Sequence, residues 1–194
     1  MSNSEDVKEK IALATIGCLE RYGRSGTTIR RIAEIGGVNS AAISYHFGGA
    51  DNLIDTVMRR TLGEAFTLSD YAEFENRDLK GYLRAVFTFL IEGARKFPNI
   101  SKAHLYGIYT DGDYSSPVVA AMNGFLEQLL RKITPKTDLT ETVLRRRLFI
   151  LMSQVVYFIV SPGLLNGFAY PNGGGPDAEG FAAALIDDLF FNDK

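Results

Sequence analysis

Apolar side chains recur at steps of three and four residues along most of this 194-residue chain, and strand-like alternation is scarce. Val7, Ile11, Ala14 and Cys18 show this spacing near the start of the chain. Residues three and four apart lie on the same side of an α-helix, so each helix has an apolar face that must pack against another helix. The sequence therefore predicts an all-α protein of about nine helices.

Glycine and proline residues divide this pattern into separate helices. We expect the first helix to end at Gly23 and a fourth to begin near Asp51. From Asp78 onward the expected helices are longer and richer in aromatic residues, and proline stands near several of their ends. Their expected ranges are 79–97, 101–109, 116–133, 139–160 and 177–191.

Residues 27–49 have the pattern of two short helices joined by a turn. Thr28 and Asn39 are suited to cap the two helix starts, because their side chains accept hydrogen bonds from backbone N–H groups. Paired glycines follow each helix. This is the helix-turn-helix arrangement, in which the second helix presents its outer face to a major groove, so DNA is the expected partner.

The second short helix carries residue types suited to that role. Ser40, Ala41 and Ser44 are small and allow close approach, whereas Tyr45 and His46 can donate hydrogen bonds to phosphate oxygens. Simpler interpretations stay open: Tyr45 as a partly buried helix residue, His46 as a cation at a helix end, and the neighbouring arginines as a solvated face.

The stretch TTIRRIAEIGGVNSAAISYHFGGADNLIDTV, residues 27–57, resembles the signature of TetR-type (TetR/AcrR) transcriptional regulators, and the similarity extends over about residues 7–60. The resemblance implies a helix-turn-helix DNA-binding domain at 1–50, a connecting helix at 51–66 and a domain for ligand binding and dimerisation at 67–194. It also implies a homodimer that represses at a near-palindromic double-stranded DNA operator until a small molecule binds.

Carried onto this chain, the resemblance assigns Thr28, Tyr45 and His46 to phosphates, with Arg30 as the best reader of a guanine edge. The expected DNA-contacting residues are Thr28, Arg30, Arg31, Asn39, Ser40, Ala41, Ser44, Tyr45 and His46. The chain departs from many relatives at Ala50, where they have a phosphate-binding lysine. Affinity would then depend on Arg24, Arg30 and Arg31, which with Glu34 leave a local charge of +2.

The rest of the chain offers candidates for a ligand pocket and a dimer interface, although each set could also be ordinary core. A pocket for an apolar or aromatic small molecule of unknown identity would be lined by side chains from the carboxy-terminal helices, with His104 as a polar contact. These candidates are Phe66, Tyr82, Phe89, His104, Tyr106, Tyr109, Met122, Phe125, Phe149 and Met152. The dimer candidates, from two helices that would pair across a two-fold axis, are Val155, Phe158, Ile159, Phe181, Leu185 and Leu189.

Composition points away from several other classes of protein. A single cysteine and two histidines far apart in sequence offer no catalytic constellation, cofactor motif or metal site, and Cys18 is expected to be core. The longest apolar stretch, 148–160, is too short to span a membrane, and the polar start lacks a signal peptide, so we expect a cytoplasmic protein. The net charge of −2 gives no overall attraction to DNA. A carrier of small molecules that has kept the fold but lost DNA binding is the alternative function, and an enzyme is a distant third.

Overall fold

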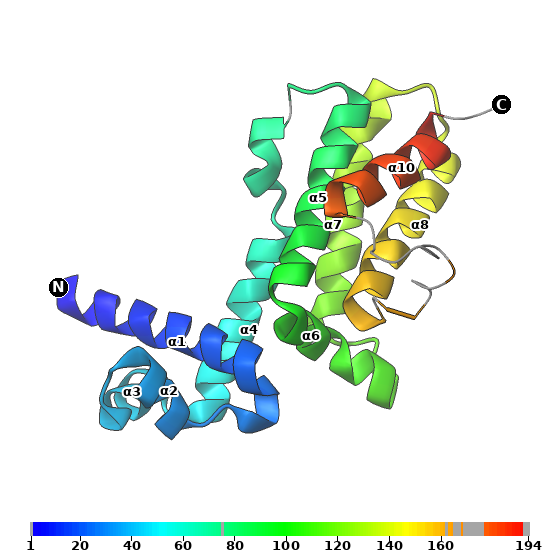
Figure 1. Ribbon diagram of the computed structural model, residues 1–194. Helices are drawn as coiled ribbons and strands as arrows, with labels where there is room; N and C mark the ends of the chain where they lie inside the picture. Colours follow the sequence, from blue (N-terminus) through cyan, green and yellow to red (C-terminus); the bar gives the residue numbers. More distant parts are fainter. Residues whose placement is uncertain (1, 75, 162, 165–167, 169–176, 192–194) are drawn as a thin grey trace. The chain divides into compact units, whose positions relative to one another are not determined.

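The structure is a computed structural model that describes residues 2–74, 76–161, 163, 164, 168 and 177–191 (Figure 1). The prediction of an all-α fold is confirmed, since the described residues form α-helices, two short 3-10 helices and no strand. The α-helices are α1 (Ser2–Gly26), α2 (Ile29–Gly36), α3 (Ser40–Phe47), α4 (Ala50–Phe66), α5 (Leu79–Lys96), α6 (Pro98–Asp111), α7 (Pro117–Ile133), α8 (Glu141–Val160) and α10 (Ala178–Phe190). The 3-10 helices are η1 (Leu68–Phe74), which the sequence pattern did not predict, and η2 (Thr134–Lys136). No helix in this part of the chain is both long and apolar enough to cross a bilayer.

The chain forms two compact units that do not follow its linear order. The first unit comprises residues 1–64 and 97–118, and the second comprises residues 65–96 and 119–194. Residues 97–118 therefore pack with the amino-terminal helices, although they fall inside the range 67–194 expected for the carboxy-terminal domain. The helix α4 begins in the first unit and ends in the second.

The first unit has a small core built largely from its amino-terminal helices. Cys18 is fully buried there, as expected from the sequence. Ile32 of α2 and Ile43 of α3 are also fully buried and fix the two short helices against α1 and α4. Helices of eight residues are unstable alone in water, so α2 and α3 depend on these anchors and on their caps.

The start of α6 is fixed by a residue from α1. The Glu20 carboxylate accepts hydrogen bonds from the backbone N–H groups of Asn99, at 3.1 Å, and Ile100, also at 3.1 Å. The Asn99 side chain donates in turn to the Glu20 carbonyl at 2.7 Å. These bonds satisfy N–H groups that a helix start leaves free. The helix expected to begin at residue 101 begins instead at Pro98, where proline at the first helical position and the Glu20 carboxylate together define its start.

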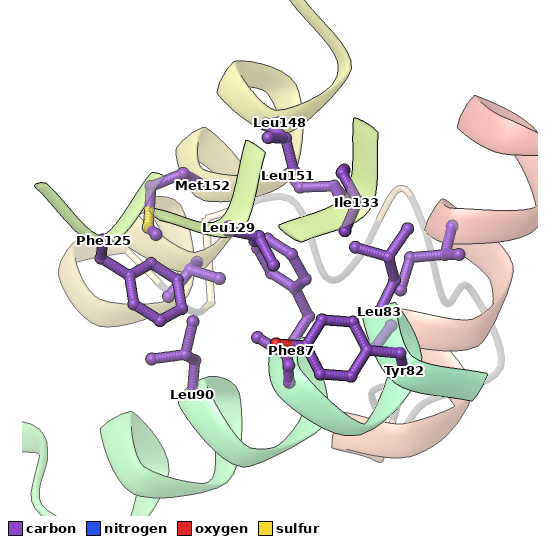
Figure 2. Packing of buried hydrophobic residues seen from close by; sticks show 14 of the residues in the cluster. Tyr82, Leu83, Phe87, Leu90, Phe125, Leu129, Ile133, Leu148, Leu151 and Met152 are labelled. Atoms are coloured by element: carbon purple, nitrogen blue, oxygen red, sulfur yellow. The ribbon is translucent and has the colours of Figure 1, made fainter. Parts of the chain in front are cut away.

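The second unit has an aromatic core built by α5, α7, α8 and α10. Figure 2 shows side chains from several of these helices gathered in one cluster, among them Tyr82 and Phe87 of α5, Phe125 and Leu129 of α7, and Leu151 of α8. All five side chains are buried almost completely. A charged contact joins α10 to α5: the Asp187 carboxylate lies 2.7 Å from the Lys80 ammonium and 2.6 Å from the Arg84 guanidinium.

Candidate nucleic-acid interface

The helix α3 is defined by a cap at each end and one buried anchor. The Asn39 side chain accepts a hydrogen bond from the Ala41 N–H at 2.8 Å, which confirms its expected place as the cap. At the other end Gly48 has a φ of 75°, which a residue with a Cβ adopts only under strain, and its N–H donates to Ser44. Ile43 points into the core between these ends. The helix is therefore held from behind while its other side faces solvent.

The outer face of α3 carries the side chains that the sequence placed there. Ser40, Ala41 and Ser44 are exposed, and Tyr45 is exposed to 85%. His46 is half-buried in the last turn, with its ring in an edge-on contact with Tyr45 at 5.0 Å between centroids. A small polar surface with a projecting tyrosine has the size and chemistry to enter a groove of DNA.

The start of α2 lies in the same unit and adds polar and basic groups. Thr28 caps this helix as expected by accepting a hydrogen bond from the Arg31 N–H at 3.4 Å. The Arg30 side chain is exposed and pairs with Glu34, one turn along α2, at 3.0 Å. The exposed Arg31 guanidinium donates to the Gly26 carbonyl. Thr28, Arg30 and Arg31 are thus accessible, but both arginines already have an intramolecular contact.

The net positive charge around Arg24, Arg30 and Arg31 is smaller in the structure than the sequence count suggested. Arg24 pairs with Asp55 of α4 at 2.8 Å, and Asp55 lies outside the stretch from which the local charge of +2 was counted. Including Asp55 lowers that charge to +1. An exposed ion pair of this kind contributes little to stability, so a phosphate group can compete for the arginine at small cost.

The expected ligand-pocket residues do not form one group. His104, Tyr106 and Tyr109 belong to the first unit and the other seven to the second. Among those seven, Tyr82, Phe125 and Met152 are core residues. Phe66 and Met122 are half-buried against the same core, and Phe89 and Phe149 are exposed. Their role in binding a ligand stays a prediction.

His104 is the one polar residue of that set, and the structure gives it a protein partner. Its Nε2 lies 3.1 Å from the hydroxyl of Thr61 on α4, and that hydroxyl is also within hydrogen-bonding distance of the Met58 carbonyl. Burial lowers the pKa of His104 to about 4, because the charged imidazolium is poorly solvated there. His104 is therefore neutral near pH 7 and helps to join α6 to α4.

The expected dimer residues lie on α8 and α10 of the second unit. Val155 is buried, whereas the other members of the set are half-buried. Phe158 and Phe181 pack edge to face, with ring centroids 4.5 Å apart. Ile159, Leu185 and Leu189 also pack against the core, so much of this set stabilises the protomer itself, and its place in a dimer stays a prediction.

Sequence reasoning missed Arg21 and Tyr22, two residues beside the interface. Tyr22 continues the apolar spacing of α1, but its ring is 40% exposed and contacts the guanidinium groups of Arg21 and Arg31. Nothing local marks the contact with Arg31, because Tyr22 and Arg31 belong to different helices. The sequence does show a concentration of arginine residues between positions 21 and 31, and this could have indicated a basic surface.

Comparison with known proteins gives a short sequence match and a complete fold match. No protein-family model matches the chain. It is 34% identical over 55 residues to the HTH-type transcriptional regulator BetI 2 of Chromohalobacter salexigens. That alignment covers 28% of the chain and spans only 27% of the length of that relative.

Two solved structures resemble the whole chain at lower identity. A tetR-family transcriptional regulator from Streptomyces coelicolor has a TM-score of 0.68 at 16% identity, covering 95% of this chain and 79% of that one. HlyIIR, a hemolysin II transcriptional regulator, has a TM-score of 0.63 at 20% identity, covering 98% and 99%. The three relatives named here are described as transcriptional regulators. The resemblance drawn from residues 27–57 is confirmed at the level of the fold: this chain has the fold of the TetR-type regulators.

Proposed function

We propose that this protein is a transcriptional regulator that binds double-stranded DNA through α3. The observation that carries the proposal is the outer face of α3, where small polar residues and the projecting Tyr45 stand on a helix anchored by Ile43. An exposed tyrosine contributes little to the core, and on this anchored helix Tyr45 is available to contact a partner. The regulators that this chain resembles support DNA as that partner.

Individual roles follow from the chemistry of each side chain. Tyr45, His46 and Thr28 would donate to phosphate oxygens and position α3 on the duplex. Arg30 would leave Glu34 and read a guanine edge through two parallel hydrogen bonds. Ser40, Ala41 and Ser44 would allow the helix to lie close to the bases, while Asn39 and Arg31 would stand at the edge of the contact.

A homodimer with a two-fold axis is part of the proposal. The half-buried apolar residues of α8 and α10 would pair with the same residues of a second copy. Two α3 helices would then contact successive major grooves about one helical turn apart, which requires a near-palindromic operator.

Regulation by a small apolar or aromatic ligand is the remaining part. The exposed aromatic residues Phe89 and Phe149 of the second unit are candidates to contact it. The ligand would weaken DNA binding only if it stabilised a dimer conformation that does not fit the operator. It must therefore bind that conformation a few kcal/mol more tightly than the DNA-binding one. A shift of α4 would carry this change, since α4 belongs to both units.

A mobility-shift assay with the DNA upstream of the protein's own gene tests DNA binding directly. Binding should weaken steeply as salt rises, because each phosphate contact releases counterions. Arg30→Ala should weaken binding about tenfold to a hundredfold, as expected when one base contact is removed. Tyr45→Ala should weaken binding to all DNA sequences to a similar extent, because it removes a phosphate contact. Unchanged binding by both variants would remove α3 and the start of α2 as the contact surface.

Matched controls exist for both substitutions. Tyr114 is also an exposed tyrosine of the first unit, and Arg146 is an exposed arginine of α8. Tyr114→Ala and Arg146→Ala remove the same side chains elsewhere and should leave DNA binding unchanged.

A carrier that has lost DNA binding is the second candidate, and one observation favours it. Arg24, Arg30 and Arg31 all have intramolecular contacts, and Ala50 supplies no charge. A carrier would show no shift at low salt while still binding an apolar compound, whereas a regulator would show the salt-dependent shift.

A further inference from the structure

The ring of Tyr22, near the end of α1, makes cation–π contacts with the guanidinium groups of Arg21 and Arg31. The Cζ of Arg31 lies 4.8 Å from the ring centre, and the Cζ of Arg21 lies 5.4 Å from it. Both distances fall within the range of about 6 Å at which an aromatic ring attracts a cation. We call Arg21, Tyr22 and Arg31 the guanidinium shelf.

The backbone around the shelf fits this arrangement closely. Arg31 donates from Nη1 to the Gly26 carbonyl at 2.5 Å, which ties the guanidinium to the end of α1. A Cβ on Gly26 would lie 2.8 Å from the Tyr22 Cβ and 3.2 Å from Arg31 Nη1. The first of these distances is too short for two carbon atoms in contact, so a side chain at this position would displace Tyr22 or the backbone beside it.

Three acidic residues of the first unit have partners other than Arg21 and Arg31. Glu20 caps the start of α6, Asp55 pairs with Arg24, and Glu34 pairs with Arg30. Within the described residues no ion pair joins Arg21 or Arg31 to a carboxylate. The shelf therefore holds two positive charges on an exposed surface, close in sequence to the α2 cap at Thr28.

We propose that the guanidinium shelf binds DNA phosphate oxygens and that Tyr22 is the residue that positions it. This inference rests on the proposed function and extends the contact surface from α3 to the end of α1. A guanidinium has five N–H donors, and Arg31 uses one of them on Gly26, so donors remain for a phosphate. The shelf supplies charge that Ala50 lacks, and its Arg21 lies outside the stretch from which the local charge of +2 was counted.

Fluorescence anisotropy with a labelled random-sequence duplex of about three helical turns tests the shelf. Phosphate contacts do not depend on base sequence, so this probe needs no knowledge of the operator. Arg21→Gln and Arg31→Gln should each weaken binding about fivefold to tenfold near 0.1 M salt. Each should also reduce the slope of log affinity against log salt by about one, since each variant removes one phosphate-binding cation.

Variants of Tyr22 separate positioning from a general effect on folding. Tyr22→Leu should weaken DNA binding and lower the salt slope, because the ring that holds both guanidinium groups is gone. Tyr22→Phe keeps the aromatic face and should bind like the unmodified protein. Arg77 stacks on Phe74 in the second unit at 4.8 Å, and Arg77→Gln is therefore a control with the same chemistry outside the shelf.

The outcomes distinguish this inference from the proposed function. Unchanged affinity and salt slope in Arg21→Gln and Arg31→Gln, with weakened binding in Arg30→Ala, would overturn the shelf and leave DNA binding through α3 in place. Absence of binding by the unmodified protein at low salt would overturn both. If Arg31→Gln disturbs folding because its bond to Gly26 is removed, Arg21→Gln decides the question.

Discussion

The two compact units both contain capped helices, α8 and α10 of the second beginning at the caps Thr140 and Asp177, but they differ in how much of the packing is local in sequence. In the first, the ends of α2 and α3 are set by residues within a few positions of each end: Thr28, Asn39 and Gly48. In the second, long helices meet around aromatic side chains such as Tyr82, Phe87 and Phe125, which come from distant parts of the sequence. Short capped helices need few inward residues, and this leaves α3 with an outer face that is available to a partner.

Aromatic residues also differ in burial, although the second unit has exposed rings as well, at Phe89 and Phe149. Tyr45 of the first unit projects into solvent, whereas Phe87 and Phe125 of the second are almost fully buried. A buried aromatic ring stabilises the fold through the apolar surface it removes from water, and an exposed one does not. Substitution of these buried rings should therefore lower the stability of the second unit, whereas substitution of Tyr45 should weaken DNA binding.

The largest expected effect on stability is Phe87→Ala in the core of the second unit. Removal of a buried phenylalanine leaves a cavity and should lower the free energy of unfolding by about 3–5 kcal/mol. Urea unfolding followed by far-ultraviolet circular dichroism measures this change. Phe149→Ala removes the same side chain from an exposed position on α8 and should have a much smaller effect. Equal destabilisation in the two variants would contradict this division between core and surface.

His104 should give the first unit a dependence of stability on pH. Burial places the pKa of His104 near 4 in the folded protein, below its ordinary value of 6.5, so the unfolded chain binds more protons between these values. The stabilising contribution is complete above about pH 6.5 and is lost as pH falls toward 4, with an upper limit of about 3 kcal/mol.

The chain has only two histidines, which makes this prediction simple to isolate. His104→Gln should reduce the change of the urea midpoint with pH between pH 6.5 and 4. Hydrogen bonds from Arg60 to Glu9, and from Lys80 and then Arg84 to Asp187, lower the pKa of both carboxyl groups, so their contributions are lost mainly below this window. A slope that persists in His104→Gln would assign the effect to other groups.

Local chemistry in the sequence predicted the helix-turn-helix but not the contacts between distant residues. The caps at Thr28 and Asn39 and the inward position of Ile43 follow from residue type and spacing, and the structure confirms them. The cap of α6 by Glu20 joins residues 80 positions apart, and periodicity does not say which helix faces meet.

The candidate site divides in the same way. Exposure of Ser40, Ser44 and Tyr45 follows from the helical period once Ile43 is placed inward. The pairing of Arg24 with Asp55 and the stacking of Arg31 on Tyr22 depend on how α1, α2 and α4 pack, and both change the charge available to a ligand. The arginine residues could therefore be read from the sequence, but their contacts could not be predicted from it.

The smallest expected effect tests the claim that caps hold the first unit together. Asn39→Ala removes the acceptor for the Ala41 N–H and should destabilise α3 by about 1 kcal/mol. Cys18 is the only cysteine and is fully buried in this unit, so its reaction with a thiol reagent reports how often the unit opens. A destabilisation of this size should raise the labelling rate about fivefold.

Matched substitutions decide whether the hydrogen bond is the cause. Asn39→Asp keeps a side-chain acceptor and should label at the rate of the unmodified protein, and Ser40→Ala changes an exposed neighbour that is not the cap. Phe87→Ala, in the other unit, should change the circular dichroism midpoint far more than Asn39→Ala does. If Asn39→Ala left the labelling rate unchanged, the Asn39 cap would contribute little to α3, which would then depend on Ile43 and on the cap at Gly48.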